Sequence, residues 1–150
     1  GLHPRLLQSR ELRVLLVDTA NALKRLAIQH VPKRSRLLKT SINSKVEDFG
    51  SQNPKVRLGS SSRYAKFVEF ATKPHEIVPK NKQALFWVDY NNPQTRARLG
   101  RAAAVFTFAA RVRHPGTKAQ PFIGPAWQVV RPRFLMALER VVRAKLAGGL

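Results

Sequence analysis

The sequence contains no cysteine among its 150 residues. Disulfide bonds, thiolate nucleophiles and cysteine-based zinc sites are therefore excluded. No apolar run approaches the roughly 20 residues that a membrane-spanning helix needs, and the first residues lack the apolar core of a signal peptide. We therefore expect a chain that is made in a cytoplasm and has no membrane partner.

Acidic residues are scarce. Eight Asp and Glu face 28 Lys and Arg, which gives a formal net charge of +20 and an isoelectric point near 11.8. A chain this basic repels itself unless a polyanion, an acidic protein surface or salt compensates. The charge favours either nucleic acid or an acidic neighbour in an assembly as partner, and it does not distinguish the two.

Two long segments have the apolar spacing of amphipathic helices. Neither proline nor glycine occurs between Pro4 and Pro32, and the 3,4 spacing of leucines predicts a helix over residues 4–30. The same spacing predicts a C-terminal helix over residues 126–147, in which Pro132 marks either a kink or the start of the regular helix. Residues 31–113 are expected to form mostly strands and loops. The sequence thus predicts one α+β domain, with an antiparallel sheet packed against the two helices.

Alternating apolar residues predict several short strands between the helices. A hairpin is expected from Ser41–Phe49 and Lys55–Gly59, because turn-forming residues separate them. Arg63–Thr72 is ambiguous, and we favour a short helix with Ser62 as a possible N-cap. The remaining predictions are extended pieces at residues 77–79 and 84–88, a flexible loop at residues 89–100 and a strand at residues 105–112.

The segment His114–Trp127 is a predicted corner. It holds three prolines and two glycines, and Pro115-Gly116 is a turn dipeptide. Pro121 and Pro125 each restrict the residue before them to extended geometry. We therefore expect neither helix nor regular strand here, but a corner that pins Phe122 and sets the angle of the last helix.

The sequence offers little that indicates catalysis. The four histidines lack metal-ligand spacing, so we expect no metal site, no cofactor and no enzyme activity. Glu69 stands among apolar residues, and a half-buried carboxylate there needs either an Arg or a cluster of backbone amides as its partner. We interpret Glu69 as a structural hydrogen-bond anchor; the alternative is a small hydrolase that uses Glu69 with His75 or His114.

Basic residues are spread along the chain in three clusters, and none of them has the signature of a sequence-reading motif. This spread favours nonspecific attraction to phosphate, or a lumen that DNA passes through, over base readout. About half of these residues fit a simpler role as solvated stems over apolar surface. The candidates for DNA or partner contact are Lys33, Arg34, Arg36, Lys39, Arg96, Arg98 and Arg101.

Four segments in order resemble the tail-component family of long-tailed bacteriophages, which are tail-completion or head–tail joining (neck) proteins. They are Val31-Pro32 with Leu37–Ile42, Tyr64–Thr72, His75–Lys80 with Ala84–Phe86, and His114–Thr117 with Gln120–Ala126. The resemblance covers residues 29–146, and its structural motif residues are Tyr64, Glu69, His114, Pro115, Gly116, Pro121, Phe122 and Pro125.

Two positions depart from the family pattern. Ser35-Arg36 stands where the family usually has Thr-Gly, and Ala71 stands where it usually has the glycine of Glu-Phe-Gly-Thr. The second departure matters more, because glycine accepts a positive φ and alanine resists it. We therefore expect the turn after Phe70 to differ.

The resemblance implies a structural virion protein that forms a ring, commonly sixfold, at the head–tail junction or the top of the tail tube. Its partners would be copies of itself, a neck or head-closure protein, and a tail terminator or tail tube protein. Genomic DNA or the tape-measure protein would occupy the lumen, lined by Arg96–Arg101 or by the Lys33–Lys45 arm. The protein would be found in the virion, and in the host cytoplasm during assembly. The alternative is a free basic protein that binds nucleic acid without sequence specificity.

Overall fold

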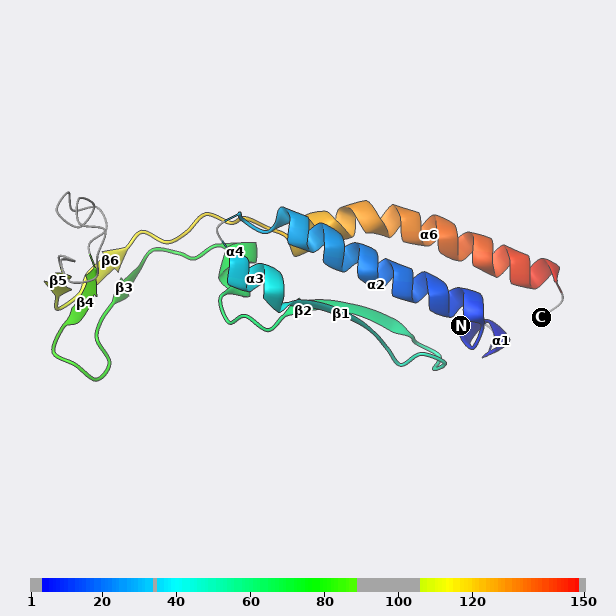
Figure 1. Cartoon of the computed structure of the whole chain (residues 1–150), viewed down its shortest axis with the longest axis horizontal. Coiled ribbons are helices and arrows are strands. Elements are labelled where there is room, and N and C mark those ends of the chain that lie inside the picture. Colours follow the sequence, from blue (N-terminus) through cyan, green and yellow to red (C-terminus); the bar gives the residue numbers. More distant parts are fainter. Residues whose placement is uncertain (1–3, 34, 89–105, 149–150) are drawn as a thin grey trace. The chain divides into compact units, whose positions relative to one another are not determined.

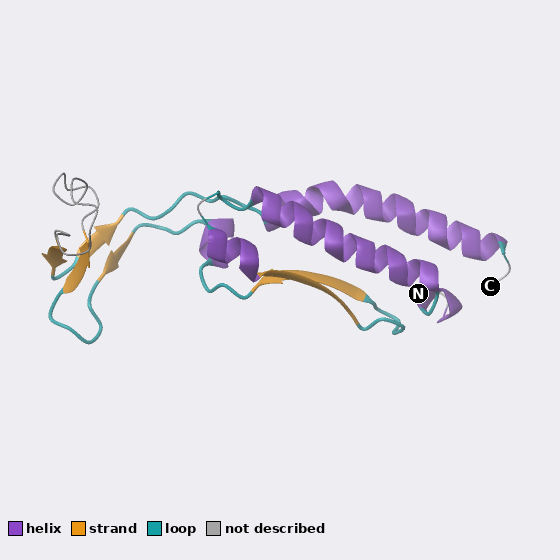
Figure 2. Ribbon diagram, in the orientation of Figure 1, coloured by secondary structure: helices purple, strands orange, loops and turns teal. Residues whose placement is uncertain are grey.

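The computed structural model describes residues 4–33, 35–88 and 106–148. It is a mixed α+β structure with long N-terminal and C-terminal helices and small antiparallel sheets, as the sequence predicted (Figures 1 and 2). The sequence predicted one domain, and within the structure the chain divides into two compact units. Unit 1 comprises residues 1–71 and 118–150, and unit 2 comprises residues 72–117.

The predicted N-terminal helix is two helices. Helix α1 is Pro4–Leu7 and helix α2 is Arg10–His30. The interruption arises because Ser9 takes an extended conformation and its hydroxyl accepts a hydrogen bond from the Leu12 N–H at 3.3 Å, which caps α2. Helix α2 ends at His30, because its C-cap Val31 is extended before Pro32.

The C-terminal helix α6, Ile123–Ala147, begins three residues earlier than predicted. The interpretation of residues 114–127 as a wholly non-helical corner is therefore wrong for its last five residues. Pro125 fits because it lies in the first turn, where backbone N–H groups have no partner within the helix. The helix continues through Pro132.

Helices α2 and α6 run antiparallel in unit 1 (Figure 1). Lys145, near the end of α6, forms an ion pair with Glu11 in the first turn of α2, with 3.0 Å between Nζ and Oε1. The pKa of the Glu11 carboxyl is lowered by a hydrogen bond from the backbone and by this ammonium group. The pair links the N-terminal end of α2 to the C-terminal end of α6.

The predicted hairpin is confirmed. Strand β1, Ile42–Glu47, pairs antiparallel with β2, Lys55–Ser60, and the hairpin contacts α2. The short helix α3, Arg36–Ser41, leads directly into β1. Two apolar clusters form the core. The first contains Ala27, Val31, Leu38, Ile42, Phe122 and Ala126, and the second contains Leu7, Leu12 and Leu16.

Unit 2 is a β-ribbon. Strand β3, His75–Ile77, pairs with β6, Val112–His114, and β4, Leu85–Val88, pairs with β5, Phe106–Ala109. The single strand predicted over residues 105–112 is therefore two strands. The pairing is interrupted between them, because the seven residues 78–84 lie opposite only the two residues 110–111. An isolated bridge between Thr72 and Thr117 closes the ribbon.

The turn beside that bridge needs glycine. Gly116 has a φ of +85°, and a Cβ there would overlap the carbonyl oxygen of Thr72. The turn predicted at Pro115-Gly116 thus brings the two backbones of the ribbon into close approach.

Helix α4, Ala65–Phe70, confirms the helical interpretation of residues 63–72. Ser62 is not its cap, because Tyr64 occupies that position and no side chain caps it. Ala71, immediately after α4, has φ +72° and ψ 175°. This is the position where the resemblance leads one to expect glycine, and the backbone keeps a conformation that glycine almost alone accepts.

We expect Ala71→Gly to stabilise unit 1. Relief of the strain is worth about 1–3 kcal/mol, and the extra freedom of glycine in the unfolded chain offsets about 0.5–1 kcal/mol. A net gain of about 1 kcal/mol should appear in urea unfolding followed by circular dichroism at the helix band, since every described helix lies in unit 1. Ala137→Gly, inside α6, is the control and should destabilise by about 1 kcal/mol.

Candidate interaction surfaces

Glu69 on α4 holds the beginning of α6. Its Oε2 accepts hydrogen bonds from the N–H groups of Phe122 at 2.8 Å and Ile123 at 3.0 Å, and its Oε1 accepts one from Gly124 at 2.9 Å. These are the open donors at the positive end of the α6 dipole, so a carboxylate is the favoured acceptor.

Of the two partners predicted for Glu69, the backbone amides are the ones found. Both carboxylate oxygens are engaged, which supports the structural interpretation over the catalytic one. Phe122 beside them is fully buried, and the Gln120 N–H donates to the Val68 carbonyl at 2.8 Å. The corner therefore pins Phe122, as predicted, through contacts with α4.

The other predicted motif residues lie in different parts of the structure. Pro121 and Pro125 flank Phe122 at the start of α6, while Tyr64 precedes α4 and is 37% exposed. His114 and its two neighbours, Pro115 and Gly116, belong to unit 2.

In unit 2, the His114 ring stacks on that of His75, its cross-strand partner, with 5.0 Å between ring centroids. Nδ1 of His114 accepts the Gly116 N–H at 3.0 Å. His114 thus has a structural role at the end of β6.

We expect Glu69→Gln to destabilise unit 1 by about 2–3 kcal/mol, because the amide removes the charge and turns a donor toward backbone N–H groups. Glu139→Gln is the matched control, since Glu139 lies on α6 in an exposed pair with Arg143. That control should cost no more than about 0.5 kcal/mol. Equal unfolding midpoints for the two variants in urea would contradict the anchoring role.

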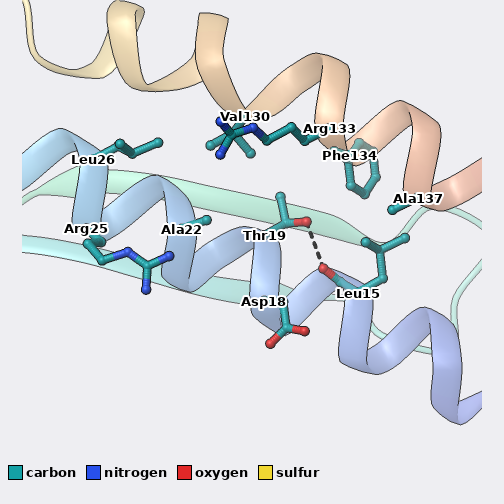
Figure 3. A pocket seen from close by; sticks show the side chains of 10 residues that line it. All are labelled: Leu15, Asp18, Thr19, Ala22, Arg25, Leu26, Val130, Arg133, Phe134 and Ala137. Carbon is teal, nitrogen blue, oxygen red and sulfur yellow. Dashed lines mark hydrogen bonds between the residues drawn. The ribbon is translucent and has the colours of Figure 1, made fainter.

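A groove of about 400 Å³ runs between α2 and α6 (Figure 3). Leu15, Ala22 and Leu26 of α2 face Val130, Phe134 and Ala137 of α6 across it. Asp18, Thr19, Arg25 and Arg133 complete the lining. The Thr19 hydroxyl donates to the Leu15 carbonyl at 2.7 Å and so carries no free donor into the groove.

The other side of α6 is also apolar. Trp127, Val129, Leu135 and Met136 are 45%, 38%, 50% and 56% exposed, and we call these four residues the outer face of α6. Helical spacing places Leu135 on the side opposite the buried Ala126 and Val130, with Trp127 and Met136 on its two flanks. A second hollow, of about 390 Å³, is lined there by Trp127, Gln128, Arg131, Pro132 and Leu135. Exposed apolar side chains beside such a hollow are typical of a surface that another surface covers.

Unit 2 exposes a row of aromatic rings. Phe86 lies opposite Phe108 in the register of β4 and β5, and its ring centroid is 6.3 Å from those of both Phe106 and Phe108. We call these three residues the phenylalanine ladder; they are 56%, 48% and 70% exposed in the order Phe86, Phe106, Phe108. Lys82 Nζ lies 5.6 Å from the centre of the Phe86 ring.

Neither the outer face of α6 nor the phenylalanine ladder was predicted from the sequence. Leu135 and Met136 lie within the predicted C-terminal helix, which was expected to bury only one side. The ladder depends on which strands pair, and that information is not local. Alternation of Phe106 and Phe108 was the available signal.

The predicted basic contact residues are only partly within the described structure. Lys33 and Arg36 are exposed and Lys39 is half-buried; they lie at and just before α3. Arg34, Arg96, Arg98 and Arg101 lie outside the described residues, as does the loop predicted at residues 89–100.

One acidic side chain offsets part of the basic charge on the β1–β2 hairpin. Glu47 bridges Lys45 at 2.6 Å and Arg57 at 2.9 Å. The hydrogen bond from Lys45 and the charge of Arg57 lower the pKa of the Glu47 carboxyl.

Comparisons with protein-family models, with curated proteins and with solved structures return no match to the chain. Within residues 4–33, 35–88 and 106–148, no group of three or more potential ligands is placed to hold a metal ion. None of the described helices is long and apolar enough to cross a membrane.

Proposed function

We propose that this protein is a structural virion protein of a long-tailed phage, which assembles into a ring at the head–tail junction or the top of the tail tube. The proposal rests first on the four ordered segments that resemble the tail-component family. The structural observation that carries it is the outer face of α6, where Leu135 lies exposed opposite the buried face and Trp127, Val129 and Met136 lie exposed on its flanks. Such a face is covered when the chain meets another surface.

The covering surface in this proposal is a second copy of the chain. A ring built from one kind of chain uses head-to-tail contacts, in which two different patches of the same molecule meet. The outer face of α6 and the groove between α2 and α6 lie on different sides of unit 1 and supply two unlike apolar patches. A hexamer, with DNA or the tape-measure protein in its lumen and neck and tail proteins above and below, follows from the resemblance.

We expect wild-type protein to form rings that are visible by negative-stain electron microscopy and that sediment as one oligomer. Leu135→Asp should shift the protein to monomer, because an interface cannot bury an unpaired carboxylate without a large penalty. Val14→Asp, on an exposed side of α2 with nearly equal exposure, 49% against 50%, is the matched control and should still assemble. A strictly monomeric wild-type protein at high concentration would refute the proposal.

Salt dependence separates this proposal from its alternative, a free basic nucleic-acid-binding protein, which the +20 charge favours. Association of like-charged chains through apolar faces should strengthen as salt screens their repulsion. Binding to duplex DNA should weaken instead, with a slope of about −0.9 in log affinity per log salt for each neutralised phosphate. Sedimentation without DNA, and anisotropy with labelled duplex, measure the two trends on the same preparation.

A further inference from the structure

The described part of unit 2 buries no side chain completely, since every buried apolar residue belongs to unit 1. A two-stranded ribbon without a core is marginally stable by itself. Yet this ribbon places three phenylalanine rings on one face. More than half of the surface of Phe86 and of Phe108, and nearly half of that of Phe106, is exposed to solvent. Exposed aromatic surface of this kind indicates a ligand that covers it.

The charge of unit 2 identifies the class of ligand. Its described residues include five Lys or Arg, namely Lys73, Lys80, Lys82, Arg111 and Arg113, against one acid, Glu76. Glu76 is already paired with Arg111 at 3.9 Å. The described part of unit 2 is thus basic, and Lys82 brings its ammonium group to the Phe86 ring.

We propose that the phenylalanine ladder is a stacking platform for single-stranded nucleic acid. Flat rings that receive bases, together with basic side chains that follow the phosphates, are the elements of sequence-independent single-strand binding. Phe86, Phe106 and Phe108 receive successive bases, and Lys82 neutralises a phosphate beside them. Duplex DNA keeps its bases stacked inside the helix, so it engages the basic residues without the rings.

The phenylalanine ladder belongs to unit 2, whereas the assembly surface on α6 belongs to unit 1. Binding to the ladder does not require assembly of the chain into an oligomeric ring. The phenylalanines contribute affinity that is insensitive to salt, because stacking releases no counterions. The lysine contributes affinity that falls with salt. These two signatures distinguish a stacking platform from general attraction between a basic chain and a polyanion.

The test is fluorescence anisotropy with labelled oligothymidine, oligouridine and duplex probes of about 20 nucleotides, longer than one typical binding site. Phe86→Leu and Phe108→Leu should each weaken binding of the single strands about fivefold or more, without changing the salt slope or the affinity for duplex. Lys82→Gln should reduce the slope by about 0.7. Phe70→Leu, on α4 in unit 1 with 78% exposure, is the matched control and should bind as wild type does. The two single-strand probes show whether DNA or RNA is preferred.

A further variant tests the proposal even if the leucine substitutions unfold the ribbon. Phe86→Trp keeps an aromatic face, so it should retain binding, and oligothymidine should quench its emission beyond the change seen in wild type. Absence of that extra quenching, or equal weakening of single-strand and duplex binding in the leucine variants, would overturn the proposal and assign the ladder to a protein partner. Sedimentation without nucleic acid should be unchanged in all four ladder-region variants, which separates this outcome from failure of the assembly role.

Discussion

The carboxylate of Glu69 is the contact on which the fold of unit 1 depends. It joins α4 to the start of α6 across a separation of 53–55 residues in the chain, with all of unit 2 between them. The three N–H groups that it accepts have no partner inside the helix, so removing the carboxylate would leave a half-buried helix end unsatisfied. Phe122 is buried beside this junction, and α6 then runs antiparallel to α2 over the apolar core.

Much of this architecture follows from local pattern. The 3,4 spacing predicts α2 and α6, and alternation with an intervening turn predicts the β1–β2 hairpin. The errors have local causes as well. Ser9 caps α2 inside a segment with no helix breaker, and Pro125 is tolerated because it lies in a first turn.

The nonlocal features were harder to predict. The need of Glu69 for a partner could be inferred from its apolar neighbours, but nothing in its own segment identifies the amides of Phe122 to Gly124. The ladder likewise appears only when β4 and β5 are paired in the observed register. Ala71 has a positive φ, a conformation that its residue type disfavours and that its own sequence therefore did not predict.

The bridge between Thr72 and Thr117 has a consequence for the order of folding. The two ends of unit 2 meet at hydrogen bonds of 3.2 Å in both directions, so the whole ribbon is an insertion with adjacent ends. Before the ribbon pairs, Glu69 and α6 must find each other across a long flexible loop, whose closure costs entropy that grows with loop length. Once Thr72 and Thr117 are paired, only a few residues separate α4 from α6. Pairing of Thr72 with Thr117 therefore shortens the loop between α4 and α6. The entropy lost when Glu69 meets α6 is smaller after this pairing than before it.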